Sequence, residues 1–322
     1  MTNAPRILLI DEPHPVLVNA LQQAGCTLHF CYQLSREEIL AALPGCTGVV
    51  VRSRLQIDHF VLAQATDLEF VARIGVGTEH IDLAACAEQE IAVFTSPEGS
   101  RDTVGEHALG MLLMLLNRLA IADREVRNGQ WIREANRGIE IKGKTVGILG
   151  YGNMGTAFAK RLSGFGADVI AYDKFKTDYG DAYARAVSLE EIQAKSEIIS
   201  IHIPYMPENH HFIDGAFLQA CAKNVYVVNT ARGTVLHTAD LVEAMRSGKV
   251  LGVALDVLEY EEMSFSTLQP DNLPEPFQYL RRSDRTVLTP HIAGWSHEAK
   301  RGHARVLSEK ILRHLGHANG EV

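Results

Sequence analysis

Residues 144–173 decide the fold of this chain. They begin Lys-Thr-Val-Gly-Ile-Leu-Gly-Tyr-Gly-Asn-Met-Gly and end Val-Ile-Ala-Tyr-Asp. Residues 145–149 are a short apolar run typical of a strand buried on both faces, and residues 153–165 have helical periodicity. A second apolar run, residues 168–172, is followed directly by Asp173. The stretch therefore predicts a strand–helix–strand unit with an acid at the end of its second strand.

Three glycines in the G-x-G-x-x-G spacing connect the first strand to the helix. Gly150 permits a tight turn, Gly152 lets the backbone approach a pyrophosphate, and Gly155 lets the helix pack closely on the strand. The helix N-terminus adds free N–H groups and a positive dipole. Asp173 would accept hydrogen bonds from a ribose and repel a 2′-phosphate, a preference that two nearby lysines weaken slightly. The unit predicts a dinucleotide site that favours NAD over NADP; the alternatives are another adenosyl ligand or none.

The composition describes a globular protein of about two domains. The chain has 322 residues, 46% of them apolar, and a formal net charge of −8. This balance argues against nucleic-acid and membrane-surface partners, and the most apolar run, residues 108–116, is too short to span a bilayer. The five scattered cysteines contain no C-x-x-C pair, so we expect buried free thiols, a cytoplasmic location and no metal site.

Apolar strand-like runs alternate with helical runs before residue 100 and again after Asp173. This order predicts an α/β fold with two doubly wound parallel-sheet domains. A Leu- and Met-rich helix is expected from Thr103 to Asn128, either linking the domains and joining a dimer interface or serving as a plain core helix. Residues 258–284 are expected to form one long loop with three prolines.

Three motifs each follow a predicted strand, where open parallel sheets place their ligands. They are Asn-Thr-Ala-Arg-Gly (229–233), Asp-Val-Leu-Glu-Tyr-Glu (256–261) and Thr-Pro-His-Ile-Ala-Gly (289–294). Together they supply a guanidinium, a carboxylate and an imidazole. Histidine can accept a hydroxyl proton as hydride leaves, a carboxylate can orient the imidazole, and arginine can fork onto a substrate carboxylate. The bland alternatives are a surface cation, solvated acids and a structural histidine.

These motifs resemble those of the D-isomer-specific 2-hydroxyacid dehydrogenase family, particularly its D-3-phosphoglycerate dehydrogenase-like members. The resemblance covers nearly the full chain and implies NAD as cofactor and a catalytic triad of Arg232, Glu261 and His291. Among three neighbouring glutamates, Glu261 is selected because the family's acid falls five residues after the aspartate represented by Asp256, which would hold the nicotinamide carboxamide. The residues implied to contact the cofactor are Gly150, Gly152, Asn153, Met154, Gly155, Asp173, Ile203, Pro204, Thr230, Ala231, Asp256, Gly294 and Val104.

The same resemblance implies a substrate loop around Val76 and Gly77, whose N–H groups would bind the carboxylate of a 2-hydroxy or 2-oxo acid. Arg52 and Ser53 follow another strand, and Arg52, with Arg54, could bind a phosphate. We therefore place 3-phosphoglycerate first, glyoxylate or hydroxypyruvate second and D-lactate third. Trp295 would line the pocket and affect substrate choice. Two other departures from the family pattern are Glu262, where many members have proline, and His237, where an acid is usual.

The resemblance also implies a domain plan, and the apolar surface of the long helix suggests an assembly. Residues 1–100 plus 296–322 would form a flavodoxin-like substrate lobe, and residues 101–295 a Rossmann NAD lobe. A homodimer is expected through the Thr103–Asn128 helix region. A chain ending at Val322 would be a short form without a C-terminal regulatory domain and without serine feedback. The alternatives outside this enzyme class are an NAD(H)-sensing corepressor and an S-adenosylhomocysteine hydrolase-like enzyme.

Overall fold

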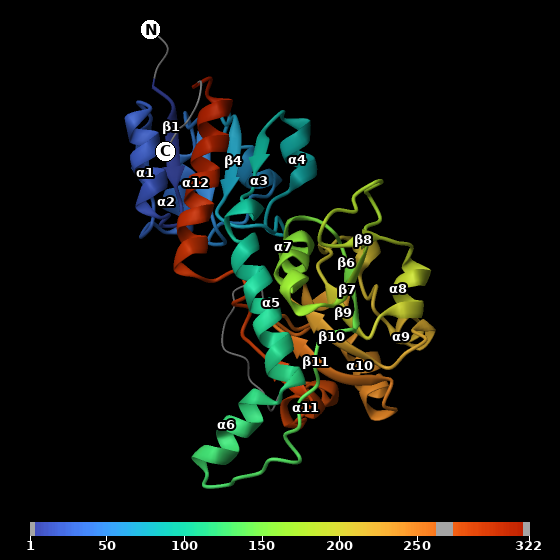
Figure 1. Ribbon diagram of the computed structural model, residues 1–322. Coiled ribbons are helices and arrows are strands. Elements are labelled where there is room, and N and C mark those ends of the chain that lie inside the picture. Colours follow the sequence, from blue (N-terminus) through green and yellow to red (C-terminus); the bar gives the residue numbers. More distant parts are fainter. Residues whose placement is uncertain (1–3, 262–272, 318–322) are drawn as a thin grey trace. The chain divides into compact units, whose positions relative to one another are not determined.

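The computed structural model describes residues 4–261 and 273–317. Contacts divide the chain into two compact units, Met1–Arg101 with Trp295–Val322 and Asp102–Gly294. Each unit contains one parallel β-sheet covered by helices, which confirms the predicted α/β class with two doubly wound sheets. Figure 1 shows the order of the elements along the chain.

The first unit is built on a five-stranded parallel sheet in the order β2-β1-β3-β4-β5. This is the flavodoxin-like order. The central strand β3 reads Gly-Val-Val-Val and is fully buried, as expected for a strand covered on both faces. The strands are β1 (Arg6–Leu9), β2 (Thr27–Phe30), β3 (Gly48–Val51), β4 (Phe70–Arg73) and β5 (Ala92–Phe94).

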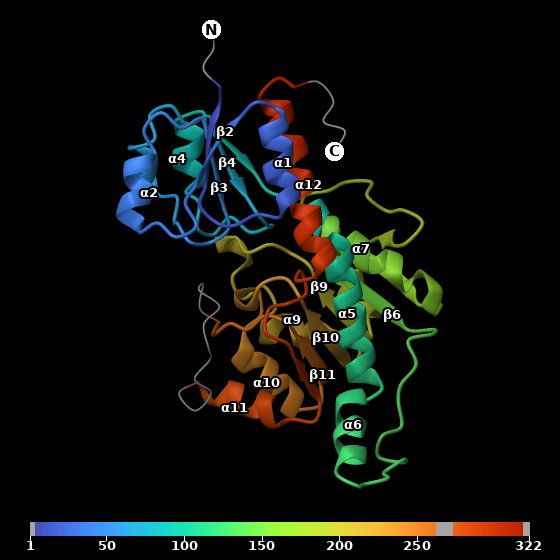
Figure 2. The same cartoon turned by 90° about the vertical axis from the view of Figure 1, so that its left-hand side faces the viewer.

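Helices cover both faces of this first sheet. One face packs against α1 and α12, which lie alongside each other in Figures 1 and 2, and the other packs against α2, α3 and α4. Helix α2 begins at a capping box, in which Ser35 and Glu38 each accept the other's backbone N–H. The helices are α1 (Pro15–Gln23), α2 (Arg36–Ala42), α3 (His59–Leu62), α4 (Leu83–Glu88), η1 (Pro97–Gly99) and α12 (His297–His314).

The second unit is built on a seven-stranded parallel sheet in the order β12-β11-β10-β9-β6-β7-β8. Its first six strands in chain order follow the Rossmann order. Strands β7 and β8 are added on one side of the first strand, β6, and the later strands are added on its other side. The predicted strand–helix–strand unit is present as β6, α7 and β7. The strands are β6 (Thr145–Leu149), β7 (Asp168–Tyr172), β8 (Arg185–Ala186), β9 (Ile198–Ile201), β10 (Val225–Asn229), β11 (Val250–Leu255) and β12 (Thr286–Leu288).

Helices α5 and α7 cover one face of the second sheet, and α8 to α11 cover the other. In Figure 2, α10 and α11 lie on the opposite side of β10 and β11 from α5. The helices and short 3-10 turns are α5 (Arg101–Leu116), α6 (Leu119–Arg127), α7 (Asn153–Leu162), η2 (Ser163–Phe165), α8 (Leu189–Lys195), η3 (Pro207–Asn209), α9 (Gly215–Ala220), η4 (Gly233–Val235), α10 (Thr238–Arg246) and α11 (Glu275–Arg282).

The single helix predicted from Thr103 to Asn128 is wrong, because the chain breaks there into α5 and α6. Arg118 adopts a left-handed conformation with φ of 53°, and the two helices are bent by 61°. The returning chain packs into the break, where the N–H of Ile139 donates to the carbonyl oxygen of Leu116. Among the described residues no single helix is long and apolar enough to cross a membrane, although this bent pair passes that test by length and composition.

The uninterrupted loop predicted for residues 258–284 is also wrong, because its second half contains α11. Residues 262–272 lie outside the described structure. Pro274 directly precedes α11 and Pro276 lies in its first turn, where the missing proline N–H costs no hydrogen bond. Phe277 and Leu280 are buried, so they anchor the helix to the unit.

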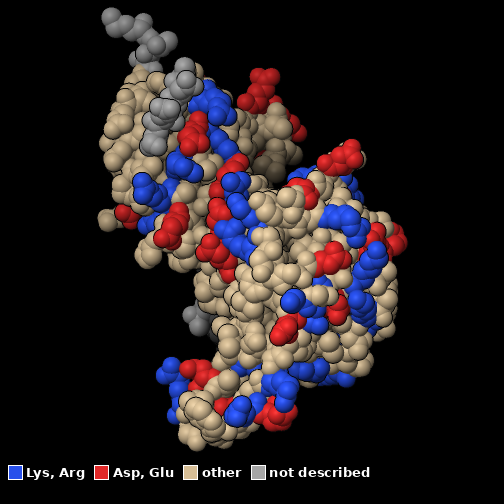
Figure 3. Space-filling view, in the orientation of Figure 1, with Lys and Arg blue, Asp and Glu red and all other residues tan. Residues whose placement is uncertain are grey.

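The distribution of charged side chains and the state of the cysteines agree with what the composition predicts. Acidic and basic side chains are interspersed over the face seen in Figure 3. All five cysteines are buried and unpaired, which confirms the expected free thiols. Burial raises the pKa of the Cys46 thiol to about 11, so this thiol is protonated near neutral pH.

Candidate active site

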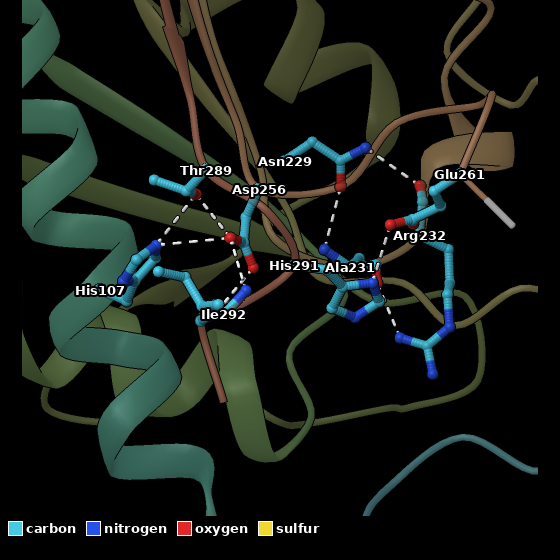
Figure 4. A network of polar contacts seen from close by, with 10 residues as sticks. His107, Asn229, Ala231, Arg232, Asp256, Glu261, Thr289, His291 and Ile292 are labelled. Atoms are coloured by element: carbon cyan, nitrogen blue, oxygen red, sulfur yellow. Dashed lines mark hydrogen bonds and ion pairs between the residues drawn. The ribbon is translucent and has the colours of Figure 1, made fainter. Parts of the chain in front are cut away.

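Three neighbouring strands of the second sheet present the predicted catalytic residues at one edge. Strands β10, β11 and β12 are parallel neighbours, with Asn229 paired to Leu255 and Leu255 paired to Leu288. Because these pairs lie at the strands' carboxyl ends, the segments carrying Arg232, Glu261 and His291 leave the sheet together. Figure 4 shows these three side chains grouped at that edge.

Glu261 and His291 form the central contact of this group. His291 Nδ1 lies 3.0 Å from Glu261 Oε2, and each side chain is 24% exposed. A carboxylate in this position stabilises the tautomer that carries its proton on Nδ1. The other ring nitrogen, Nε2, is then left with its lone pair and can accept a proton from a substrate.

Asp256 fixes the turn that carries His291. Its side chain is buried, and its two oxygens accept the backbone N–H groups of Ile292 and Ala293 at 2.9 and 2.7 Å. The N–H of His291 itself donates to the carbonyl oxygen of Asp256 at 2.8 Å. These bonds hold His291 in a left-handed conformation with φ of 55°, which is costly for a residue with a Cβ. Asp256 therefore acts on His291 through the backbone, a role that the sequence did not predict.

His107 and Thr289 complete the surroundings of Asp256. The Thr289 hydroxyl donates to Asp256 Oδ1, and His107 Nε2 lies 3.2 Å from the Thr289 hydroxyl oxygen. Burial alone would raise the pKa of Asp256, but hydrogen bonds from His107, Thr289 and the two N–H groups hold it below its ordinary value. Asp256 is thus a carboxylate with most of its hydrogen-bonding capacity used within the chain. A contact to a nicotinamide carboxamide would be additional to these bonds.

Asn229 shapes the turn that carries Arg232. Its buried side-chain amide donates to the carbonyl oxygen of Arg232 at 3.0 Å and accepts the N–H of Ala231 at 3.0 Å. One guanidinium nitrogen of Arg232 donates to the carbonyl oxygen of Ala231 at 2.7 Å. The Asn229 side chain therefore holds the turn closed through Ala231 and Arg232. The position of Asn229 as the last residue of β10 is the sequence signal for this role.

The glycine turn after β6 has the geometry that a pyrophosphate needs. Gly150 has φ of 88°, and a Cβ there would lie 2.7 Å from the carbonyl oxygen of His202. A Cβ on Gly155 would lie 2.1 Å from the carbonyl oxygen of Gly150. Only a glycine at this position of α7 therefore lets the helix pack so closely on the turn. Gly152 has open space where a Cβ would be. It is the N-cap residue of α7, so no side chain caps the N-terminus of this helix. Asn153 and Met154 form the first residues of that helix.

A cavity of about 110 Å³ lies next to this turn, and its lining mixes the predicted glycines with apolar side chains. Asp173 stands at its wall, accepting the N–H groups of Tyr151 and Phe175 at 2.9 and 3.0 Å. Its remaining lone pairs are available to ribose hydroxyls. The residues that line the cavity are Leu149, Gly150, Gly152, Tyr172, Asp173, Lys174, Phe175, His202, Ile203, Pro204, Asn209 and Phe212.

The other predicted cofactor residues lie in the same unit with differing exposure. The hydroxyl of Thr230 is buried and has no hydrogen-bond partner among the described residues. Such an orphan is costly unless a ligand satisfies it. Ala231 follows it in the same turn, Gly294 ends the unit, and Val104 is a buried residue of α5. The open glycine turn and the unpaired hydroxyl both fit a bound dinucleotide.

The predicted carboxylate loop belongs to the first unit and follows β4. The N–H groups of Val76 and Gly77 make no hydrogen bond to another described residue, and Val76 is 37% exposed. Gly75 has φ of 140°, and a Cβ there would lie 1.5 Å from an Arg73 guanidinium nitrogen. The loop can therefore present two free donors to an anion, with Arg73 packed against its glycine.

The second predicted substrate strip, Arg52 to Arg54, is organised by Asp11. The N–H groups of Arg52, Ser53 and Arg54 all donate to Asp11 Oδ2, at 2.6, 3.2 and 3.4 Å. The guanidinium of Arg54 is held by the chain itself, because it donates to four backbone carbonyl oxygens, those of Ile10, Cys31, Tyr32 and Leu34. The Arg52 guanidinium instead lies over the indole ring of Trp295, 5.3 Å from its centroid.

Comparison with known proteins places this arrangement in a family. Residues 109–293 match the model described as D-isomer specific 2-hydroxyacid dehydrogenase, NAD binding domain. A D-3-phosphoglycerate dehydrogenase of Archaeoglobus fulgidus is 32% identical over 95% of this chain, which spans 56% of that relative's length. A hydroxypyruvate reductase of Thermotoga maritima is 33% identical over 88% of this chain and 89% of its own.

A solved structure gives the same picture. The structure of a D-lactate dehydrogenase from Aquifex aeolicus, in complex with NAD and lactic acid, superposes with a TM-score of 0.80 at 26% identity. The match covers 97% of this chain and 96% of that one. The chain belongs to the D-isomer-specific 2-hydroxyacid dehydrogenase family, and its second unit is the NAD-binding domain of that family.

Proposed function

We propose that this protein is an NAD-dependent dehydrogenase that transfers a hydride between nicotinamide and a D-2-hydroxy acid. The observation that carries the proposal is the 3.0 Å contact between Glu261 and His291 at the strand edge of an NAD-binding domain. A base of this kind is what the oxidation of an alcohol requires. Bound NAD supplies the hydride acceptor for the reaction.

The residues of this chain would act on the substrate as follows. His291 accepts the hydroxyl proton at Nε2, because Nδ1 is engaged by Glu261. The Glu261 carboxylate stabilises the resulting imidazolium. Arg232 forks onto the substrate carboxylate and polarises the neighbouring oxygen, where negative charge is localised during the reaction. In the first unit, the N–H groups of Val76 and Gly77 are the proposed donors to a substrate carboxylate.

For the substrate we propose 3-phosphoglycerate first, with glyoxylate or hydroxypyruvate as the runner-up and D-lactate third. The Archaeoglobus relative supports the first choice and the Thermotoga relative the second. Because Arg54 is committed to backbone carbonyls, a phosphate in the first unit would depend on Arg52, with Trp295 beside it and Ser53 next in the chain. We assign substrate binding to the first unit and cofactor binding to the second.

The experiment that tests this function is a panel of D-hydroxy acids and 2-oxo acids with NAD or NADH. The absorbance of NADH at 340 nm is followed for 3-phosphoglycerate, D-glycerate, D-lactate, glycolate and the matching oxo acids. We expect turnover with at least one pair. Tight NADH binding with no turnover of any compound would contradict the proposal and favour an NAD(H)-sensing protein.

We further propose a homodimer formed through the Thr103–Asn128 region. Helix α6 has a strongly amphipathic sequence, and Leu119 and Val126 are 52% and 51% exposed. Trp131, in the segment that follows, is 80% exposed. Large exposed apolar side chains within one short segment, here residues 119–131, are typical of a protein interface. Light scattering should give twice the chain mass, and Trp131→Glu should give the chain mass.

A cytoplasmic location is the last part of the proposal. Five buried, unpaired cysteines suit a reducing compartment. Fractionation of cells that produce the protein, with a cytoplasmic marker enzyme followed in parallel, tests this directly. Recovery in a membrane or extracellular fraction would contradict it.

A further inference from the structure

A second cluster of ligating side chains lies in the second unit, outside the proposed catalytic group. One ring nitrogen of His211, one of His237 and a carboxylate oxygen of Glu259 all lie within 4.8 Å of one another. These residues come from three separate segments, the loop after η3, the start of α10 and the loop after β11. The sequence predicted no metal site because its cysteines form no C-x-x-C pair, and the three residues of this cluster are far apart along the chain.

The three side chains are held in place by further hydrogen bonds. His211 Nε2 lies 2.7 Å from Glu259 Oε1, while Glu259 Oε2 accepts the N–H of Thr238 at 2.9 Å. His237 Nδ1 lies 3.0 Å from Asp240 Oδ2, which also accepts the N–H of Gly215 at 2.7 Å. A carboxylate on one ring nitrogen leaves the other nitrogen, here Nε2 of His237, with a lone pair for a ligand. Metal-binding histidines usually have such a partner.

The cluster is also partly shielded from water. The side chains of His211, Glu259 and His237 are 28%, 19% and 34% exposed. The imidazole rings of His211 and His237 are tilted by 35° to each other, with their centroids 4.4 Å apart. His211 holds a left-handed backbone conformation with φ of 52°, which has an energetic cost for a residue with a Cβ.

We propose that His211, His237 and Glu259 bind a divalent transition-metal ion, with Zn²⁺ as the best match and a fourth position left to water. Two imidazoles and one carboxylate form a ligand set that zinc uses in proteins, and imidazole favours zinc over calcium and magnesium. Asp240 is a positioning residue in this site, because it orients His237 rather than touching the ion.

Binding has a balanced proton count. Without metal, the proton on His211 Nε2 is shared with Glu259 Oε1. When Nε2 binds the ion, this proton leaves Nε2 and the neutral ring takes up one at Nδ1, so the ring changes tautomer and no net proton is released. Ligand bonds of about 2.1 Å around a tetrahedral ion separate neighbouring ligand atoms by roughly 3.4 Å. The 2.7 Å contact between the two atoms must therefore open by only a fraction of an ångström, which side-chain rotation can supply.

The ion would cross-link the segments that carry the proposed catalytic residues. Glu259 precedes Glu261 by two residues, and a Cβ on Gly233, next to Arg232, would lie 2.0 Å from the backbone of Leu258. The same two loops are therefore packed against each other already. A bound ion would stiffen both, so metal binding is expected to affect thermal stability whether or not the proposed hydride transfer is correct.

The test uses the full chain without a histidine tag, treated with a chelator and titrated with Co²⁺ alone. We expect one ion per chain with the intense visible absorption of four-coordinate Co²⁺, and displacement of that absorption by Zn²⁺. His237→Asn and Glu259→Gln should each lower the affinity by at least 100-fold. Asp240→Asn should lower it by about 10- to 100-fold. His59→Gln, a change at an exposed histidine of the first unit, is the matched control and should leave the affinity unchanged.

Thermal melting keeps the test valid if a variant is less stable. Zn²⁺ at about 100 times its Kd should raise the Tm of the metal-free wild-type chain by roughly 5 °C or more. The His237→Asn and Glu259→Gln chains should show no rise above their own metal-free Tm. Equal Co²⁺ affinity in the wild type and His237→Asn would overturn the proposal. So would the absence of Co²⁺ binding by the wild type at 100 μM.

Discussion

Replacing Glu261 by glutamine removes the charge from the central contact of the site and preserves its shape. During oxidation His291 gains a proton, and the Glu261 oxygen 3.0 Å away stabilises that positive charge. At an effective dielectric constant of about 20, two unit charges at this distance attract by roughly 5.5 kcal/mol. The amide keeps part of this energy as a hydrogen bond, and solvent reaches both side chains, so we expect a loss of about half.

A loss of roughly 2–3 kcal/mol in the transition state lowers kcat by about 30- to 150-fold. The assay is NADH formation at 340 nm with whichever hydroxy acid the wild type oxidises, together with the Kd of NADH from fluorescence. Glu208→Gln, at an exposed glutamate of the same unit, is the control and should behave as the wild type. A Glu261→Gln chain with kcat within threefold of the wild type would refute the reasoning. Unchanged NADH affinity is expected because Glu261 does not line the dinucleotide cavity.

Three further predictions concern the guanidiniums and the response to acid. Arg232→Lys should lower kcat/KM by about 10²- to 10³-fold with NADH affinity unchanged, because one ammonium cannot fork onto a carboxylate; steady-state rates with less than a tenfold loss would contradict this. Arg52→Ala should weaken 3-phosphoglycerate more than glyoxylate, and equal losses in kcat/KM would remove the phosphate argument. Burial lowers the pKa values of His202 and His303 to about 4, below the ordinary 6.5, so the unfolded chain takes up protons first on acidification. Their contribution is therefore complete above pH 6.5 and declines as pH falls toward 4, by up to roughly 2 kcal/mol each at pH 5. The free energy of unfolding from urea titrations should fall between pH 7 and pH 5, and His303→Asn should make this fall smaller. An equal free energy of unfolding at the two pH values would contradict the prediction.

The sequence predicted those parts of the site that depend on local pattern. Apolar runs and glycine spacing indicated both sheets, and parallel strands must bring their carboxyl ends to one edge. That rule is why Arg232, Glu261 and His291 could be expected together before any coordinates. The contact between Glu261 and His291 follows from it, although the choice among three neighbouring glutamates needed the family resemblance.

The remainder depended on contacts between residues far apart in the sequence, or on local breaks that composition conceals. The helix break at Arg118 falls where Asn117 and Arg118 interrupt the apolar run, and the hydrogen bond from the N–H of Ile139 to the carbonyl oxygen of Leu116 joins distant residues there. The three N–H groups that bind Asp11 belong to residues about forty positions away. His211 and Glu259 are 48 residues apart in the sequence, and the left-handed backbone of His211 is a conformation that the sequence gives no reason to expect of a histidine.

The prolines near residue 274 illustrate the opposite error. Three prolines within one stretch suggested a loop, but proline is well suited to the first turn of a helix. The buried Phe277 and Leu280 are three residues apart, a helical spacing that the composition of the surrounding stretch obscured. Helix α11 was therefore readable in principle from its apolar positions.

The central claim is that His291 moves a proton while hydride passes between NAD and the C2 carbon of a D-2-hydroxy acid. The most direct measurement is chiral analysis of the product formed from a 2-oxo acid and NADH by the wild type and by His291→Ala, with NADH affinity measured for both. We predict the D product from the wild type and a rate lower by several orders of magnitude from a His291→Ala chain that still binds NADH. An L product, or near-normal turnover without the imidazole, would contradict the account.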